Sequence, residues 1–308
     1  MLIGLHHVGR VVHDLEHTAR QLHAMSGWPI TSLAAGDDPL VAGRDVQASA
    51  RAEGPNGWIE LVGVAAPAGR RREVNEPGVT HAGIQTGSIE QVADRASTAG
   101  IVSHADPVEL GTGFQYLYVR DAEQLVTEIE GAPHAPADLE PWLVHGAIAT
   151  PDVDRLRAAY EDLIGSPALN TARLRGHAAV DRLSALSDVD ITGTWVPLTN
   201  AKVEIWQFHN PPTGAPEQPD YETPGTGHLA FESDDLHADL ARAKAAGFTV
   251  EDEPAGTDRL EMTRLRDPDG NWVELIAFHR ADDTLSLRMR PDLLRPSRMD
   301  ALLHGGQQ

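Results

Sequence analysis

The sequence of 308 residues contains no cysteine. This absence excludes a disulfide framework, a thiol nucleophile and a zinc–thiolate site. Basic residues are also scarce, because Lys plus Arg total 25 against 46 for Asp plus Glu, which gives a formal net charge of −21. A chain this acidic is repelled by phosphate backbones and anionic lipids. We therefore expect no nucleic-acid partner and no membrane partner.

Long hydrophobic runs are missing as well. No apolar stretch is long enough to span a bilayer, and the N-terminus opens directly into a strand-like segment without the features of a signal peptide. We therefore expect a cytoplasmic protein. Its richness in Ala, Arg and Asp is typical of a high-GC bacterial source. The length is that of two ordinary domains.

What the chain does contain is a fourfold internal repeat. The segment LHHVGRVVHDLEHTARQLHAMSGWPI from Leu5 aligns with LVHGAIATPDVDRLRAAYEDLIGSPA from Leu143. In the same way THAGIQTGSIEQVADRASTAGI from Thr80 aligns with GHLAFESDDLHADLARAKAAGF from Gly227. Each segment reads as a short apolar strand, a turn, an amphipathic helix and a Gly, and further alternating strands follow. The pattern predicts an α+β fold of four βαβββ modules.

Each module carries a histidine on its first strand and a glutamate on its last. The histidines are His7, His81, His145 and His228, and the glutamates are Glu60, Glu128, Glu204 and Glu274. Glu128 is chosen by aligning Arg120-Asp121 with Arg266-Asp267, and Glu130, which faces the same side, is its rival. Alternate residues of neighbouring strands share one face of a sheet, so these side chains can converge on one ion. Imidazole with carboxylate suits Fe, Mn, Co, Ni or Zn.

Three motifs carry a family resemblance. They are H-V-G-x-V-V-x-D-L at 7–15, G-H-L-A-F-E-S-D-D-L at 227–236 and D-P-D-G-N-W-V-E-L at 267–275. With them the chain resembles the vicinal oxygen chelate superfamily over about residues 1–280, a family that includes glyoxalase I, bleomycin-resistance proteins, methylmalonyl-CoA epimerase and extradiol dioxygenases. The resemblance implies two tandem domains, each an incomplete barrel of two modules that holds one divalent metal ion.

The expected domain division follows the halves of the repeat. Residues 1–132 and 142–280 are predicted to form the two domains, with a Pro-rich linker at 133–141 and a tail at 281–308. Short connections favour pairing of consecutive modules, which gives the sites His7/Glu60/His81/Glu128 and His145/Glu204/His228/Glu274. Pairing of the first module with the last is the alternative, and it gives His7/Glu60/His228/Glu274 and His81/Glu128/His145/Glu204. The C-terminal half is favoured as catalytic, because the first half has Asp-Ala-Glu-Gln at 121–124 in place of Asp-Pro-Asp-Gly.

The resemblance implies an enzyme with one divalent metal ion per site and a small, vicinally oxygenated substrate. An isomerase, epimerase or lyase that works by metal-assisted proton transfer is preferred, with Glu204 and Glu274 as bases. Arg264 is expected to hold a carboxylate, phosphate or hydroxyl pair of the substrate. Ring cleavage by an Fe(II) extradiol dioxygenase is the first alternative, although Arg264 stands where that branch has a signature Tyr. A metal-free protein that binds an antibiotic is the second. The Pro-rich segment 209–227 is a candidate lid over the site. For the tail at 281–308 three outcomes are expected as alternatives: it covers the other domain, it covers the second subunit of a homodimer, or it frays.

Overall fold

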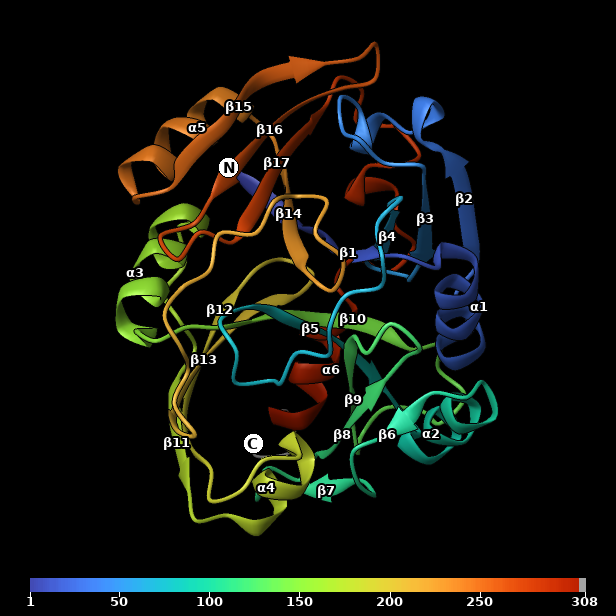
Figure 1. Cartoon of the computed structure of the whole chain (residues 1–308), viewed down its shortest axis with the longest axis vertical. Helices are drawn as coiled ribbons and strands as arrows, with labels where there is room; N and C mark the ends of the chain where they lie inside the picture. The colour runs from blue at the N-terminus through green and yellow to red at the C-terminus, as the bar shows by residue number, and fades with distance from the viewer. Residues whose placement is uncertain (305–308) are drawn as a thin grey trace.

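A computed structural model describes residues 1–304 and contains two twisted sheets with helices packed on their outer faces (Figure 1). The predicted α+β class and the four βαβββ modules are confirmed. Across residues 1–304, none of the helices combines the length and apolarity that crossing a membrane requires.

The modules follow one another along the chain. The first contains β1 (Leu2–Val12), α1 (Leu15–Ser26), β2 (Ile30–Ala34), η1 (Ala35–Asp37), η2 (Pro39–Val41), β3 (Ala48–Glu53) and β4 (Trp58–Gly63). The second contains β5 (Gly78–Thr86), α2 (Ile89–Thr98), β6 (Val102–Ser103), β7 (Val108–Glu109), β8 (Gln115–Arg120) and β9 (Val126–Gly131). The third contains β10 (Trp142–Ala149), α3 (Val153–Ile164), β11 (Thr171–Arg175), α4 (Ala178–Ser184), β12 (Asp190–Pro197) and β13 (Lys202–Asn210). The fourth contains β14 (Gly227–Ser233), α5 (Leu236–Ala245), β15 (Thr249–Gly256), β16 (Leu260–Arg266) and β17 (Trp272–Phe278), and η3 (Leu287–Met289) and α6 (Arg295–His304) follow it.

The helices begin and end where the repeated residues place them. The side chains of Asp14 and Asp152 accept hydrogen bonds from the first turns of α1 and α3, which caps the free amides there. Gly27 and Gly165 end the same helices in the left-handed conformation, with φ of 80° and 77°. The apolar face of each helix then packs on its sheet.

The sheets pair the first module with the last. Sheet A has the strand order β15-β16-β17-β14-β1-β4-β3-β2, and sheet B has the order β11-β12-β13-β10-β5-β9-β8-β6, with β7 beside β8. Strand β1 is antiparallel to β14, and β5 is antiparallel to β10. The predicted pairing of consecutive modules, and with it the assignment of residues 1–132 and 142–280 to separate barrels, is therefore wrong. Short connections did not decide the pairing, because consecutive modules instead meet through their helices, α1 with α2 and α3 with α5.

Two buried asparagines join the sheets. Asn56, in the turn before β4, bonds to both the amide and the carbonyl of Leu143 in sheet B. Asn200, at the equivalent turn before β13, bonds in the same way to Leu5 in sheet A. Each amide thereby satisfies buried backbone groups of the opposite sheet, and a net hydrogen bond of this kind contributes about 1 kcal/mol. This reciprocal contact fixes the two sheets side by side.

The inner faces of the sheets are free of α1, α2, α3 and α5, whereas α4 packs on the inner face of sheet B. Residues on one side of the strands, such as Ile84, Ile129 and Ile205, join the large core beneath the helices. Residues on the other side, including every predicted His and Glu of the repeat, face the concave side. The tail packs back on the chain, because Ser286 Oγ donates to Glu232 and Arg295 donates to the carbonyl of Glu140. Residues 305–308 of that tail lie outside the described residues.

Candidate metal centres

The eight repeat residues gather into two clusters, one on each sheet. Centre A contains His7, Glu60, His228 and Glu274, and centre B contains His81, Glu128, His145 and Glu204. Each centre takes one His and one Glu from each half of the chain. The expectation that the C-terminal half alone forms the catalytic site is therefore wrong, because His145 and His228 lie on different sheets.

Centre B brings two imidazoles and two carboxylates together. Nε2 of His81 lies 3.3 Å from Oε2 of Glu128 and 3.3 Å from Oε2 of Glu204. Nε2 of His145 lies 3.0 Å and 3.5 Å from the same two oxygens. All four side chains are buried, and their donor atoms lie within 4.8 Å of one another. One ion can therefore contact all four.

Neighbouring side chains orient the ligands of centre B. Nδ1 of His145 lies 3.4 Å from Oε1 of Glu130, whose other oxygen accepts a bond of 2.6 Å from Gln85. Nδ1 of His81 lies 3.0 Å from Oγ1 of Thr80. With Nδ1 of His81 bonded to Thr80 and Nδ1 of His145 facing Glu130, each ring turns Nε2 towards the centre. Glu130, the rival in the sequence, thus lies behind His145, and Glu128 lies at the centre.

Centre A repeats this geometry on sheet A. Nε2 of His7 lies 3.2 Å from Oε2 of Glu60 and 3.6 Å from Oε2 of Glu274. Nε2 of His228 lies 3.1 Å from Nε2 of His7 and within 3.7 Å of both carboxylates. His7, Glu60 and His228 form the closest group. The repeat therefore yields two candidate centres of the same composition.

A further histidine sets the tautomer of His7. Nε2 of His6 is 2.8 Å from the carbonyl oxygen of Leu285, so it carries a proton. Burial, and then the neighbouring His7, lower the pKa of His6 well below its usual value, which leaves Nδ1 as an acceptor. Nδ1 of His7 donates to that atom across 2.8 Å. Nε2 of His7 is then free to hold an ion. The repeat gives no sign of this role for the adjacent His6, which has no counterpart in the other modules.

Centre A is closed by two side chains that reach over it. Tyr221, from the Pro-rich segment 209–227, donates to Oε1 of Glu274 at 3.0 Å and stacks on the ring of His228. Arg264 donates to the same Oε1 at 2.8 Å and to the carbonyl of Leu40 in η2. The candidate lid thus lies over sheet A. Arg264, predicted to hold a substrate, is bonded to Glu274 and to η2.

Centre B lies next to a pocket and an apolar wall. His81 and Thr80 line a space of about 560 Å³, partly open to solvent, between the two sheets. Apolar side chains from β8, β12, β13 and α4 form the adjoining cluster, among them Tyr118, Ile191, Phe208 and Val180. Trp195 donates to Oε1 of Glu204 at 2.7 Å and holds that carboxylate in place. α4 and these supporting contacts were not predicted from the repeat.

The charges of both centres are arranged for a cation. Burial would lower the pKa of His145, but Glu204 and Glu128 outweigh it and raise this pKa well above its usual value. Burial would raise the pKa of Glu204, but His145 and His81 lower it to about 2. In centre A, burial would lower the pKa of His7, but Glu60 outweighs burial and raises this pKa above its usual value. Without metal, His145 therefore holds a proton beside the ionised Glu204, and His7 holds one beside Glu60, whose pKa His7 and His228 lower against the effect of burial.

Unpaired oxygens show what the carboxylates lack. Within residues 1–304, both oxygens of Glu60, Oε2 of Glu274 and Oε2 of Glu204 are buried without a hydrogen-bond partner. Leaving a buried acceptor unsatisfied costs about 1–3 kcal/mol, more for a charged group. A divalent ion bound by these oxygens and the imidazole Nε2 atoms would satisfy them, so the residues fit a metal of the Fe, Mn, Co, Ni or Zn type.

Comparison with known proteins identifies the fold. Glyoxalase I from Zea mays is 15% identical, with a TM-score of 0.64, over 89% of this chain and 92% of that one. A candidate dioxygenase from Bacillus subtilis is 14% identical, with a TM-score of 0.60, over 99% and 96%. No curated protein matches the sequence. Residues 142–275 match the model of the Glyoxalase/Bleomycin resistance protein/Dioxygenase superfamily. Residues 142–275 therefore belong to that superfamily, known also as the vicinal oxygen chelate superfamily, and the whole chain has its tandem fold.

Proposed function

We propose that this chain is a divalent-metal-dependent enzyme that moves a proton next to a carbonyl of a small, vicinally oxygenated molecule, as an isomerase, epimerase or lyase, and that centre B is its active site. The observation that carries the proposal is the convergence of two oriented imidazoles and two carboxylates beside a pocket that reaches His81. A metal in centre A would be structural, since Tyr221 and Arg264 cover it.

The donor set favours proton transfer over ring cleavage. Iron oxygenases of the two-His-one-carboxylate type keep one face of the metal open, whereas centre B offers a second carboxylate. A bound divalent ion supplies Lewis acidity that polarises a carbonyl oxygen of the substrate. Glu204 is well placed as the base, because Trp195 holds Oε1 while Oε2 has no hydrogen-bond partner among the described residues.

In the proposed step, Glu204 serves as the base rather than as a ligand, and His81, Glu128 and His145 would hold the ion. Its Oε2 takes a proton from the carbon next to the carbonyl. The C–H electron pair moves into a carbon–carbon double bond, and the carbonyl oxygen gains the negative charge. Return of the proton to the former carbonyl carbon, while the hydroxyl proton of the adjacent carbon passes to the new alkoxide oxygen, isomerises an α-hydroxy carbonyl substrate. Return of the proton to the other face of the original carbon epimerises it. Trp195 keeps the carboxylate in one orientation, and the apolar wall of Tyr118, Ile191 and Phe208 excludes water from the charged intermediate.

Metal content and isotope exchange together test the proposal. The protein would be loaded with Mn²⁺, Co²⁺, Ni²⁺, Zn²⁺ or Fe²⁺ and incubated in D₂O with a panel of α-hydroxy and α-keto carbonyl compounds and thiol adducts of 2-oxoaldehydes. We expect metal-dependent incorporation of deuterium next to the carbonyl, followed by proton NMR. Glu204→Gln should reduce the exchange rate by roughly 10²-fold or more. Glu60→Gln, the matched change in centre A, should leave the rate unchanged.

Three outcomes would contradict the proposal. Oxygen consumption with catechols that needs ferrous iron would favour a ring-cleaving dioxygenase. Loss of exchange in Glu60→Gln with full exchange in Glu204→Gln would move the active site to centre A. Absence of bound metal under every loading condition would favour a metal-free binding protein.

A further inference from the structure

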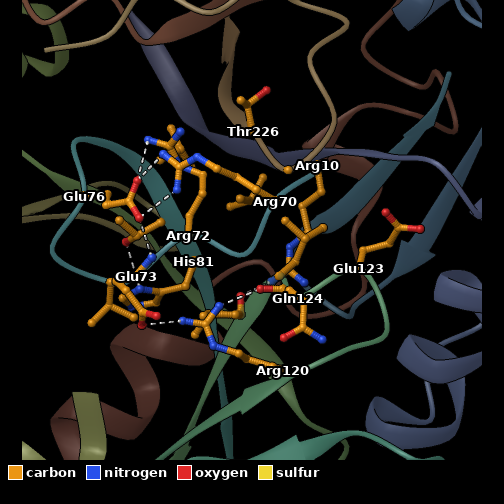
Figure 2. A pocket seen from close by; sticks show the side chains of 18 of the residues that line it. Arg10, Arg70, Arg72, Glu73, Glu76, His81, Arg120, Glu123, Gln124 and Thr226 are labelled. Atoms are coloured by element: carbon orange, nitrogen blue, oxygen red, sulfur yellow. Dashed lines mark hydrogen bonds and ion pairs between the residues drawn. The ribbon is translucent and has the colours of Figure 1, made fainter. Parts of the chain in front are cut away.

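Four arginines line the pocket beside centre B, although the chain carries a net charge of −21. They are Arg10, Arg70, Arg72 and Arg120, and His81 stands in the same lining (Figure 2). Arg10 and Arg120 are buried. Positive side chains concentrated in one recess of an acidic protein create a local site for an anion.

Among residues 1–304, the hydrogen bonds of Arg120 go only to neutral partners. Its Nε donates to Nε2 of His104 at 2.8 Å, and its Nη1 donates to the carbonyl of Gln124 at 2.6 Å. Within the described chain its Nη2 is buried without a hydrogen-bond partner. Glu73, which pairs with Nη2, is 3.6 Å away, too far for a hydrogen bond. Figure 2 shows this guanidinium turned into the pocket between Glu73 and Gln124.

The repeat supplies a matched arginine that is fully occupied. Arg266 stands at the position equivalent to Arg120, and its Nη1 donates to the carbonyl of Gly270 as Arg120 does to Gln124. However, Arg266 also donates to the carbonyl of Pro219 and pairs with the carboxylate of Glu251 at 3.3 Å. The same strand position therefore has a charged partner in the fourth module and an unfilled donor in the second.

Of the three carboxylates that line the pocket, Glu123 and Glu76 are engaged by groups other than Arg120. Glu123 accepts from the backbone amides of His13 and Asp14 at the start of α1. Glu76 pairs with Arg70 and accepts from the amide of Glu73. Burial, and then the nearby Arg71, lower the pKa of Arg120, as expected for a buried positive charge without a close counter-ion. An unpaired buried charge is costly, so the pocket is suited to an anionic ligand.

We propose that this pocket binds an oxyanion, a carboxylate or phosphate group, with Nη2 of Arg120 as its principal donor. Arg70 and Arg72 stand at its mouth, paired with Glu76 and Glu217. Assigning that oxyanion to the substrate rests on the proposed function, because the same pocket reaches His81 of centre B. The substrate would then carry its anionic group in the arginine pocket and its reacting oxygens at the centre. Glu73 is the group that a bound anion displaces.

Calorimetric titration of metal-free protein with inorganic phosphate and with acetate tests the pocket apart from the metal. We expect the wild type to bind at least one of the two, and the tighter one identifies the group. Arg120→Gln should weaken binding roughly tenfold or more, the value expected for one charged hydrogen bond. Arg266→Gln, the matched control, should bind as the wild type does. Glu73→Gln should bind more tightly, because it removes the competing carboxylate.

Failure of the two proposals is distinguishable. No anion binding, or binding that Arg120→Gln and Glu73→Gln leave unchanged, would overturn the pocket whatever the metal content. If circular dichroism shows that Arg120→Gln is unfolded, the direction of the Glu73→Gln effect decides. Anion binding by a protein that never holds metal would overturn the proposed enzyme and leave the pocket standing. In an active enzyme, Arg120→Gln should raise KM for anionic substrates and leave kcat and metal content unchanged.

Discussion

Nε2 of His81 lies 3.3 Å from Oε2 of Glu204, although the first stands in the second module and the other in the third. Their strands, β5 and β13, are separated in sheet B by β10 alone, which carries His145. The contact therefore depends on the antiparallel pairing of β5 with β10, where the halves of the chain meet. Each centre exists only when both halves are folded together.

Metal stoichiometry should follow this cross-half pairing. His81→Ala and His145→Ala should each remove the ion of centre B, and the double variant should lose no more than either alone. His7→Ala combined with His81→Ala should lose both ions. Elemental analysis of the purified variants measures the metal content. If His7→Ala and His81→Ala emptied the same site, the cross-half centres would be refuted.

Glu130→Gln should weaken metal binding at centre B. Its carboxylate pairs with Nδ1 of His145, and removal of such a supporting carboxylate typically costs 10–100-fold in metal affinity, so we expect about that loss. Competition with a chromophoric chelator measures the affinity. Glu253→Gln, an exposed residue on β15 of the other sheet, is the control and should have no effect. Equal affinity of Glu130→Gln and wild type would show that Glu130 does not orient His145.

The modules could be predicted from the sequence because their signals are local. Asp14 and Gly27 mark the ends of one helix, and the alternation in Trp58–Gly63 marks a strand that carries Glu60. Which modules share a sheet could not be predicted, because strand pairing depends on contacts between distant segments. The reciprocal bonds of Asn56 and Asn200 are among those contacts, and an asparagine in a turn gives no sign of its partner.

The ligands could likewise be predicted, and their surroundings could not. His145 and Glu204 repeat in register with their counterparts, so periodicity reveals them. Tyr221 comes from an irregular segment whose path the repeat does not determine, yet it closes centre A. The free donor of Arg120 was equally hidden, because its difference from Arg266 lies in the partners that the fold supplies, His104 in one case and Glu251 in the other.

Two glycines on the central strands should be required for the centres. A Cβ at Gly83 would clash with the imidazole of His145, and one at Gly9 would clash with that of His228. We expect Gly83→Ala to destabilise the fold by about 1–3 kcal/mol through overpacking and to remove metal from centre B only. Gly9→Ala should do the same at centre A. Metal analysis with urea unfolding tests both, and a Gly83→Ala protein with full metal at both centres would contradict the geometry.

Metal binding at centre B should release protons at neutral pH. Although burial opposes it, Glu204 and Glu128 raise the pKa of His145 well above its usual value, so the metal-free imidazole is protonated and an ion must displace that proton. Below the raised pKa, affinity should increase about tenfold per pH unit for each proton released. Calorimetry in two buffers of different ionisation enthalpy counts the protons.

The raised pKa of His145 also makes the stability of the fold depend on pH, and stability should change with pH in opposite directions in metal-free and metal-loaded protein. A histidine whose pKa is raised on folding stabilises the fold fully below its unfolded pKa, near 6.5, and this contribution is lost as pH rises through the folded pKa. The melting temperature of metal-free protein should therefore fall as pH rises through that range. Metal-loaded protein should instead gain stability as protons cease to compete, and His145→Gln should lose both trends. Parallel curves for the two forms would refute protonation of His145 in the empty centre.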